Sequence, residues 1–288
     1  MKRLIVTADD FGLALPVNDA VEVAHRQGIL TAASLMVTGA AAADAVARAK
    51  RLPRLGVGLH LVLVDGRPAL PPAEIPDLVG ADGRFSNNLW RTGVKIFCSA
   101  AARRQVEAEI RAQLEAFRRT GLALDHVNAH HHFHQHPTVQ AILLKLAPEF
   151  GILAIRVPRE PPLLAWRATG TGLVARFATW FFQARRTARM ARRFRAAGIR
   201  CNDRMLGLGD SGRMRAERVR GYLAMLPDGV SELYFHPAVS RWEGPDAWPD
   251  EYDGAGEFAA LIDPAARAMI AERGIAMTSF AELADVAA

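Results

Sequence analysis

The sequence predicts an α/β fold in which parallel strands form a closed or nearly closed, TIM-barrel-like (β/α) barrel. Short apolar runs alternate with helical patterns seven or eight times along the 288 residues, as parallel-sheet proteins require. This length suits such a barrel, including a distorted or seven-stranded form. No stretch rich in Ser, Gly or Pro divides the chain, so residues 1–288 are expected to form a single domain.

An open, doubly wound sheet is the alternative to the barrel. The same alternation of strands and helices would build it. A dinucleotide site of the kind found in many such sheets is disfavoured, because no Gly-x-Gly-x-x-Gly follows the first strand.

The first half of the chain supplies its elements in a regular order. Strands are expected at 4–7, 33–37 and 56–64, and helices at 17–27 and 40–52. Gly28 can end the first helix, and the second is rich in Ala. The run GVGLHLVLV is a third strand. A polar stretch rich in Pro, Gly and Asp follows at 65–88, and we expect a loop there.

The second half continues the pattern. Apolar residues spaced 4, 4 and 3 apart mark an amphipathic helix at 106–117, which Gly121 closes. The remaining strands are expected at 124–129, 152–157, 204–208, 232–235 and 276–280, and the remaining helices at 138–150, 217–226 and 264–273. A basic helical insertion is expected around 161–200.

The charge of the chain is concentrated in this insertion. The formal net charge is +6, and residues 161–200 contain nine arginines and no Asp or Glu. The rest of the chain is therefore slightly acidic. Nucleic-acid enzymes carry a broader basic footprint and aromatic-and-basic strand motifs, so no nucleic-acid partner is expected.

The compartment is predicted from two further features. Two cysteines make no disulfide framework, which favours a reducing compartment. The opening MKRLIVTADDFG has neither the apolar run of a signal peptide nor the length of a membrane span. We expect a cytoplasmic protein, with peripheral attachment to the inner membrane as an option.

Polar residues that do not fit a packing role fall at or near the carboxyl ends of the predicted strands. These are Asp9, Asp10, His60, the histidine run from 126 to 136, Arg156 and His236. Barrel enzymes build their active sites on this face. Each has a simpler explanation when taken alone: a helix cap for the aspartates, a core position for His60, a turn for His236 and an ion pair for Arg156.

The histidine run is the most specific signal. Six of the nine histidines lie within eleven residues, a composition that favours metal binding or proton transfer. A carboxylate with two imidazoles is a usual ligand set for a catalytic divalent metal. Because neighbouring side chains at a strand end diverge, one aspartate can bind the metal while the other accepts a proton from water.

These motifs resemble the YdjC-like carbohydrate deacetylases. The resemblance rests on Asp9-Asp10-Phe11-Gly12 with Asn18, on GVGLHL around His60, on HHHxH at 130–134 and on His236-Pro237. It covers nearly the whole chain and keeps the motifs in order. The sequence looks most like the hopanoid-biosynthesis-associated branch (HpnK).

The resemblance implies a TIM-barrel-like fold and metal-dependent removal of an N-acetyl group from an amino sugar. Asp10, His60 and His130 would bind the metal, Asp9 would be the general base and His236 the general acid. The substrate or supporting contacts would be His132, His134, Arg156 and Asn18. The family often has Asp-Ser before the histidine run, where this chain has Asn128-Ala129, so a carboxylate that orients a histidine is lost or supplied elsewhere.

The branch implies an N-acetylglucosaminyl hopanoid lipid as substrate. The insertion fits it, because aromatic residues from 163 to 182 precede the arginines, and such a stretch can rest on an anionic membrane. A lid or a dimer contact would look the same. One divalent ion is expected, Zn²⁺ or Mg²⁺ first, with Mn²⁺, Co²⁺ or Ni²⁺ as alternatives.

Other functions are left open. A deacetylase of a soluble N-acetylated oligosaccharide, such as a chitooligosaccharide, is the alternative within the family. A non-catalytic His-rich metal-binding protein would need neither Asp9 nor His236. A glycoside hydrolase needs two carboxylates on opposite sides of the sugar bond, and Asp9 and Asp10 are too close in sequence for that.

Overall fold

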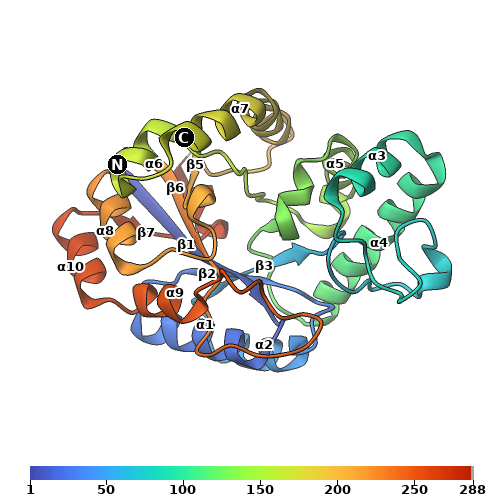
Figure 1. The fold of residues 1–288 in the computed structure, drawn as a ribbon, viewed down its shortest axis with the longest axis horizontal. Coiled ribbons are helices and arrows are strands. Elements are labelled where there is room, and N and C mark those ends of the chain that lie inside the picture. Colours follow the sequence, from blue (N-terminus) through green and yellow to red (C-terminus); the bar gives the residue numbers. More distant parts are fainter. Residues whose placement is uncertain (287–288) are drawn as a thin grey trace.

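The structure is a computed structural model that describes residues 1–286. Its centre is one sheet of parallel strands in the order β4–β3–β2–β1–β6–β5, with β7 also paired to β1 (Figure 1). The strands are β1 (Lys2–Phe11), β2 (Ala32–Leu35), β3 (Gly56–Leu61), β4 (Val127–Ala129), β5 (Arg204–Leu206), β6 (Gly229–Phe235) and β7 (Ala276–Met277). The α/β class and the parallel sheet are confirmed, but the paired strands form a half-barrel rather than a closed barrel.

The sheet is open between β4 and β5, where the sequence predicts a strand at 152–157. Within the described chain this run makes only two isolated bridges, one to β4 and one to Arg200. At its end, the Asn202 side chain accepts a hydrogen bond from Val157 N–H at 2.7 Å and donates to the Val157 carbonyl at 2.9 Å. The predicted strand is therefore shorter and irregular. Residues 153–156 pair through the backbone with Val127 on one side and with Arg200 on the other, and the pairing ends at Val157, whose backbone groups bond to a side-chain amide instead.

Helices surround the sheet (Figure 1). They are α1 (Leu15–Gln27), α2 (Ala42–Ala49), α3 (Leu89–Cys98), α4 (Ala100–Arg119), α5 (Pro137–Phe150), α6 (Pro162–Thr169), α7 (Leu173–Ala196), α8 (Ala216–Ala224), α9 (Gly254–Leu261) and α10 (Pro264–Glu272), with short 3₁₀ turns η1 (Pro72–Glu74), η2 (His130–Gln135), η3 (Leu208–Asp210) and η4 (Ala281–Val286). Helices α3 and α9 lie where the sequence pattern predicts no element. Among residues 1–286, no helix combines the length and apolar content needed to cross a bilayer.

β1 runs through the core and ends at the edge of the sheet where the candidate site residues lie. Every residue from Leu4 to Phe11 is buried, and strands covered on both faces read as nearly continuous apolar runs. The exceptions are Thr7 and the two aspartates at its carboxyl end. The residues that break the apolar run therefore lie at the edge where parallel barrels place their active sites.

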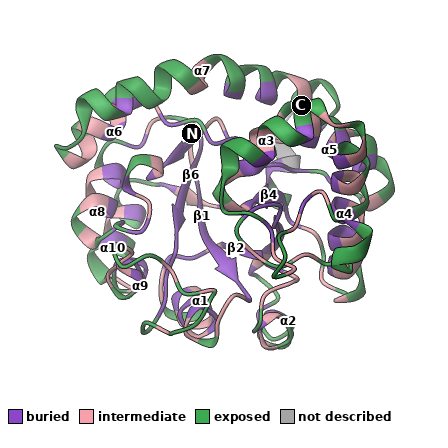
Figure 2. Ribbon diagram, turned by 45° about the vertical axis from the view of Figure 1, so that its right-hand side comes forward, coloured by how far each residue is buried: buried purple, intermediate pink, exposed green. Residues whose placement is uncertain are grey.

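The predicted basic insertion is the helical hairpin α6–α7. It is fixed by Arg176, which donates to Glu160 at 2.9 Å and to Asp210 at 2.8 Å. The Tyr222 hydroxyl donates to Asp210 at 2.7 Å. Most of α7 beyond this anchor is exposed (Figure 2). The hairpin is thus bound to the body at Arg176 and again along the second half of α7, where Met190, Ala191 and Phe194 are buried in the core. The residues between these two anchors are mostly exposed.

Candidate active site

β1 ends in two aspartates whose side chains face different groups. Asp10 has a φ of 63°, a left-handed conformation that costs about 1–2 kcal/mol for a residue with a side chain. Its carbonyl accepts a hydrogen bond from Leu13 N–H at 2.9 Å, which closes a turn. Asp9 contacts an arginine and an amide, whereas Asp10 contacts two imidazoles. This divergence is what the adjacent pair predicts.

Asp10, His60 and His130 converge on one point. The Asp10 Oδ1 atom lies 3.2 Å from Nε2 of His60 and 3.2 Å from Nδ1 of His130. Candidate ligand atoms of the three residues lie within 4.8 Å of one another. Asp10 is fully buried, yet within residues 1–286 its Oδ1 has no hydrogen-bond partner. A bare buried carboxylate oxygen is costly, so this donor set fits a divalent cation.

Asn128 fixes the tautomer of His60. Its Nδ2 donates to Asp9 Oδ1 at 3.1 Å and to Ser34 Oγ at 2.8 Å. Because a carboxylate only accepts, the amide oxygen must face His60, whose Nδ1–H donates to it at 2.6 Å. Nε2 of His60 is therefore left as the acceptor that points to Asp10. The orienting role expected of a carboxylate is performed by this amide.

Arg156 holds Asp9 in the ionised form. The guanidinium donates to Asp9 Oδ2 at 2.5 Å and to Glu232 Oε1 at 2.8 Å, and its side chain is fully buried. Burial by itself would raise the pKa of Asp9, but the Arg156 charge outweighs it and holds that pKa well below its usual range. Asp9 is thus a carboxylate with both oxygens fixed at the edge of the pocket.

Burial favours the neutral form of two further histidines of the pocket. Burial lowers the pKa of His132 and of His236, and the Arg156 charge lowers that of His132 further. Nδ1 of each has no hydrogen-bond partner within the described residues. Both can therefore accept or pass a proton on a ligand that enters the pocket.

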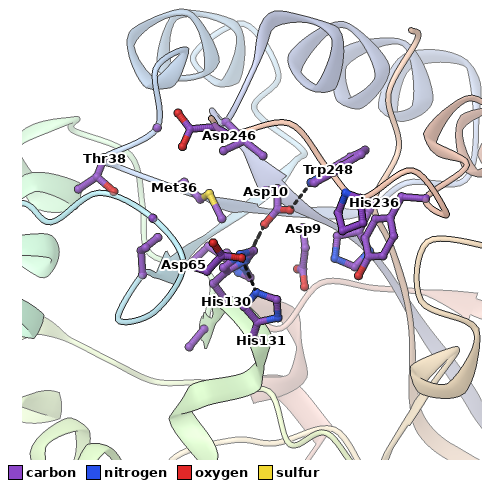
Figure 3. Close-up of a pocket in the computed structure, with 18 of the residues that line it drawn as sticks. Asp9, Asp10, Met36, Thr38, Asp65, His130, His131, His236, Asp246 and Trp248 are labelled. Atoms are coloured by element: carbon purple, nitrogen blue, oxygen red, sulfur yellow. Dashed lines mark hydrogen bonds and ion pairs between the residues drawn. The ribbon is translucent and has the colours of Figure 1, made fainter. Parts of the chain in front are cut away.

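Backbone strain is gathered around this pocket. Within residues 1–286, four residues other than glycine have a positive φ: Asp10, Asp65, His131 and His132. All four line the same cavity of about 320 Å³. Such conformations persist where the surrounding structure holds them, and they cluster at functional sites. In Figure 3, Asp10 and His130 lie together, and Asp65 lies beside His131, with 3.1 Å between Asp65 Oδ2 and His131 Nε2.

Three of the predicted site residues support the pocket from behind. Asn18 accepts from Gly12 N–H at 2.8 Å and donates to the Ala41 carbonyl at 3.0 Å, so it holds the turn after β1. His134 Nε2–H donates to the carbonyl of Arg156 at 3.0 Å, and burial lowers the pKa of His134 to about 3. None of Asn18, His134 and Arg156 lines the cavity. The other predicted residues, Asp9, Asp10, His60, His130, His132 and His236, all line it.

Sequence reasoning misses two contributors. Glu232 lies within the apolar run of β6, and a charged residue at a fully buried strand position could have indicated a paired cation. Trp248 donates from Nε1 to Asp10 Oδ2 at 2.8 Å. It lies in an irregular segment, and no periodicity in the sequence marks it.

Fold and site together define an α/β protein of the parallel half-barrel type with a carboxylate–imidazole cluster at the carboxyl ends of its strands. Residues 3–272 match the model of the YdjC-like protein family, and the chain belongs to this family. The chain is 33% identical over 281 residues to a carbohydrate deacetylase of Geobacillus stearothermophilus, a match that covers 96% of each. It is 32% identical over 303 residues to the human carbohydrate deacetylase, covering 98% of this chain and 91% of that protein.

Other comparisons are shorter or concern the fold alone. A carbohydrate deacetylase of Brevibacillus brevis is 44% identical over 162 residues, and this match spans 60% of that protein and 56% of this chain. A solved structure from Enterococcus faecalis V583, named for cellobiose-phosphate cleavage, superposes with a TM-score of 0.75 at 24% identity and covers 98% of each chain. That likeness supports the half-barrel fold.

Proposed function

We propose that the protein is a divalent-metal-dependent N-deacetylase that hydrolyses the acetamide of an amino sugar to acetate and a free amine. The observation that carries the proposal is the bare, buried Oδ1 of Asp10 between the imidazole nitrogens of His60 and His130. The ionised Asp9 lies beside it in the same pocket. Family membership and relatives named as carbohydrate deacetylases support the reaction class.

Asp10, His60 and His130 would hold the metal. A divalent cation there supplies a Lewis acid for the acetyl carbonyl and makes a water easier to deprotonate. Two nitrogens and one oxygen favour Zn²⁺ and the later transition metals over Mg²⁺, and Mn²⁺, Co²⁺ and Ni²⁺ are compatible with the same donors.

Asp9 acts as the general base. Its carboxylate takes a proton from the water that attacks the acetyl carbon, and a new C–O bond forms. Because Asn128 and Arg156 each hold one oxygen, the carboxylate is oriented before substrate arrives. The negative charge that Arg156 maintains keeps Asp9 unprotonated and ready to accept.

His236 acts as the general acid. The C–N bond breaks when the sugar nitrogen receives a proton, and His236 is the imidazole of the pocket that lies outside the Asp10 cluster and the histidine run. Its Nδ1 has no partner among the described residues. His236 therefore takes up a proton during turnover and passes it to the departing amine.

The substrate we favour is a lipid-linked N-acetylglucosamine, as in the hopanoid branch. Helix α7 exposes Val174, Phe181 and Phe182, each more than 70% accessible. Helix α3 exposes Trp90 (78%) and Phe97 (62%), and its first residue, Leu89, lines the pocket. Both helices are largely exposed in Figure 2. Exposed aromatic groups of this kind are typical of a surface that meets a lipid or a partner. Of the two helices, only α3 contributes to the lining of the pocket.

The arginines of α7 support the proposal of peripheral attachment to an anionic leaflet. Of the nine arginines between 161 and 200, Arg176 is buried and paired, and Arg195 pairs with Asp203 at 2.8 Å. The arginines at 185, 186, 189 and 192 are exposed on α7 and can meet lipid phosphates at about 1 kcal/mol each. A lipid-linked sugar would then be presented to the pocket at the inner membrane.

Acetate release from a matched panel tests the proposal. The purified chain, stripped of metal and reloaded with Zn²⁺, Mg²⁺, Mn²⁺, Co²⁺ or Ni²⁺, is given N-acetylglucosamine as the free sugar, as a chitooligosaccharide and as a glycolipid in vesicles. Release that needs metal and is fastest on the glycolipid supports the whole proposal. Faster acetate release from the chitooligosaccharide would show that a soluble oligosaccharide, and not a glycolipid, is the preferred substrate. No release from any member of the panel overturns the deacetylase assignment.

A further inference from the structure

The segment 239–253, between β6 and α9, lies against the mouth of the candidate active site. Its residues from Pro245 to Pro249, together with Tyr252, line the cavity. Most of the segment is exposed. Its two arms are tied to each other by Arg241, which donates to Asp250 at 2.6 Å. The segment is thus a compact loop that covers the pocket with little buried surface of its own.

Two contacts hold the middle of this loop to the body. Trp248 donates from Nε1 to Asp10 Oδ2 at 2.8 Å (Figure 3). Asp246 pairs with Arg84, and its other oxygen lies 3.5 Å from Nε of Arg67. Both arginines belong to the loop at 65–88 on the opposite side of the cavity. Asp246 therefore joins the two loops that border the pocket.

The position of Trp248 is built into the loop and the start of α9. A Cβ atom added to Gly254 would lie 2.9 Å from Cζ3 of Trp248, so only glycine leaves room for the indole there. The Trp248 ring also packs against Trp242, with 4.8 Å between centroids, and against His236 at 5.8 Å. The indole N–H is therefore aimed at Asp10 by packing on several sides.

Because of the Trp248 hydrogen bond, the two carboxylate oxygens of Asp10 face different groups. Oδ2 receives the indole N–H, whereas Oδ1 faces His60 and His130. An indole N–H only donates and does not titrate in the physiological range, so it orients the carboxylate without neutralising it. Partners of this kind typically change metal affinity by 10- to 100-fold.

We propose that Trp248 is the positioning residue for Asp10, carried by a lid at 239–253 that Asp246 latches to Arg67 and Arg84. The lid thus makes two separate contacts, one from Trp248 to Asp10 and one from Asp246 to the loop at 65–88. This inference rests on the proposed function for the identity of the bound cation and substrate.

The test compares two tryptophans of the same lid. Trp248→Phe removes the N–H that reaches Asp10 and keeps an aromatic ring. Trp242→Phe is the matched control, because it keeps an aromatic ring against Trp248 and removes an indole N–H that has no partner among the described residues. Calorimetric titration with Zn²⁺ is expected to show about 10-fold weaker binding for Trp248→Phe and unchanged binding for Trp242→Phe. A Co²⁺ absorption spectrum that shifts only in Trp248→Phe would show altered coordination.

Asp246→Asn tests the latch independently of the cation. We expect KM to rise several-fold with kcat and Zn²⁺ affinity unchanged, because the carboxylate ties the loops together and does not touch Asp10. Unchanged Zn²⁺ affinity in folded Trp248→Phe would overturn the positioning role, and an unchanged KM in Asp246→Asn would overturn the latch. If Zn²⁺ binding weakens as expected while wild type releases no acetate, the deacetylase proposal fails and the positioning role stands.

Discussion

Two buried arginines, Arg156 and Arg176, each form ion pairs with two carboxylates, but their surroundings differ. Arg156 lies between Asp9 and Glu232 below the pocket, and Arg176 lies between Glu160 and Asp210 at the base of α7. Each is a guanidinium enclosed by two carboxylates. Composition and burial alone would rank them equally as candidate sites.

The two clusters differ in how many hydrogen bonds their carboxylates accept from other groups of the protein. Around Arg176, Glu160 also accepts backbone N–H groups from Gly207 and Leu208 at 2.8 and 2.9 Å. The Tyr222 hydroxyl donates to Asp210 as well, so the cluster is satisfied internally. Around Arg156, Glu232 Oε2 has no partner in residues 1–286, and Asp9 lines a cavity. Both clusters border a cavity, because Glu160, Arg176 and Asp210 line a second one of about 470 Å³. The cavity beside Arg156 differs in that it also holds the converging donors of Asp10, His60 and His130, so the neighbouring donor set, rather than buried charge, separates the candidate site from the other cluster.

The largest effects should come from the cluster around Arg156. His130→Ala removes one of the three converging donors, so we expect it to lose both the metal and turnover. Asp9→Asn keeps the three donors and should keep the metal, while kcat falls by about a thousand-fold or more because the base is gone. Metal content by mass spectrometry alongside acetate release separates the two variants. Full activity in either one contradicts the assignment.

The arginines themselves should separate stability from rate. Arg156→Met and Arg176→Met each leave two buried carboxylates without their cation, which costs about 3–5 kcal/mol. Only Arg156→Met should also lower kcat strongly, because Asp9 loses the guanidinium that holds its Oδ2 atom in place. Urea unfolding and kcat, measured on the folded fraction of each variant, test this. Equal losses of kcat would mean that the two clusters do not differ in function.

Glu257 extends the comparison to a buried carboxylate without a cation. It accepts from Met214 N–H at 2.9 Å and from His236 N–H, and burial raises its pKa from 4.5 to about 8. The folded state therefore keeps a proton that the unfolded state releases above pH 4.5. Stability from this group is full below about pH 4.5 and declines by a few kcal/mol up to about pH 8. Glu257→Gln should flatten that decline in urea titrations at several pH values; an unaltered slope would assign it to other groups.

The smallest effect on catalysis is expected on α7. Phe181→Ser with Phe182→Ser removes exposed apolar surface far from any buried partner, so stability and release of acetate from a free sugar should change less than twofold. Flotation with vesicles containing anionic lipid should drop markedly. Vesicles of neutral lipid serve as the control, and flotation that ignores lipid charge would argue for a protein partner or another copy of the chain.

The candidate site could be predicted well where it follows the strands. Asp9, His60 and His236 are found because they interrupt or end apolar runs whose carboxyl ends meet at one edge. Trp248 is not found, because it reaches Asp10 from a loop 238 positions further along the chain. The sequence of this loop does not indicate which distant residue Trp248 will contact in the folded protein.

The fold shows the same division. The alternation of elements predicts the parallel sheet, because both periodicities are local properties of the chain. Closure is not local. Most of the run at 152–157 is buried as expected of a strand, and its backbone pairs with Val127 and Arg200. The pairing ends at Val157, whose hydrogen bonds go to Asn202, 45 positions away, so the sequence near the run does not determine it.

The opening between β4 and β5 makes the molecule modular. The chain leaves the sheet near Pro158, builds the α6–α7 hairpin and returns at Arg200, which exchanges backbone hydrogen bonds with Leu153 and Ile155. The exposed residues of α7 between Arg176 and the buried Met190 can therefore change without disturbing this pairing or the core. Under the proposed function, the residues that would meet the lipid and the residues that would cleave the amide then lie in separate parts of the chain. Chimeras that exchange only these exposed residues should change which lipid-linked or free sugar is preferred, while acetate is still released.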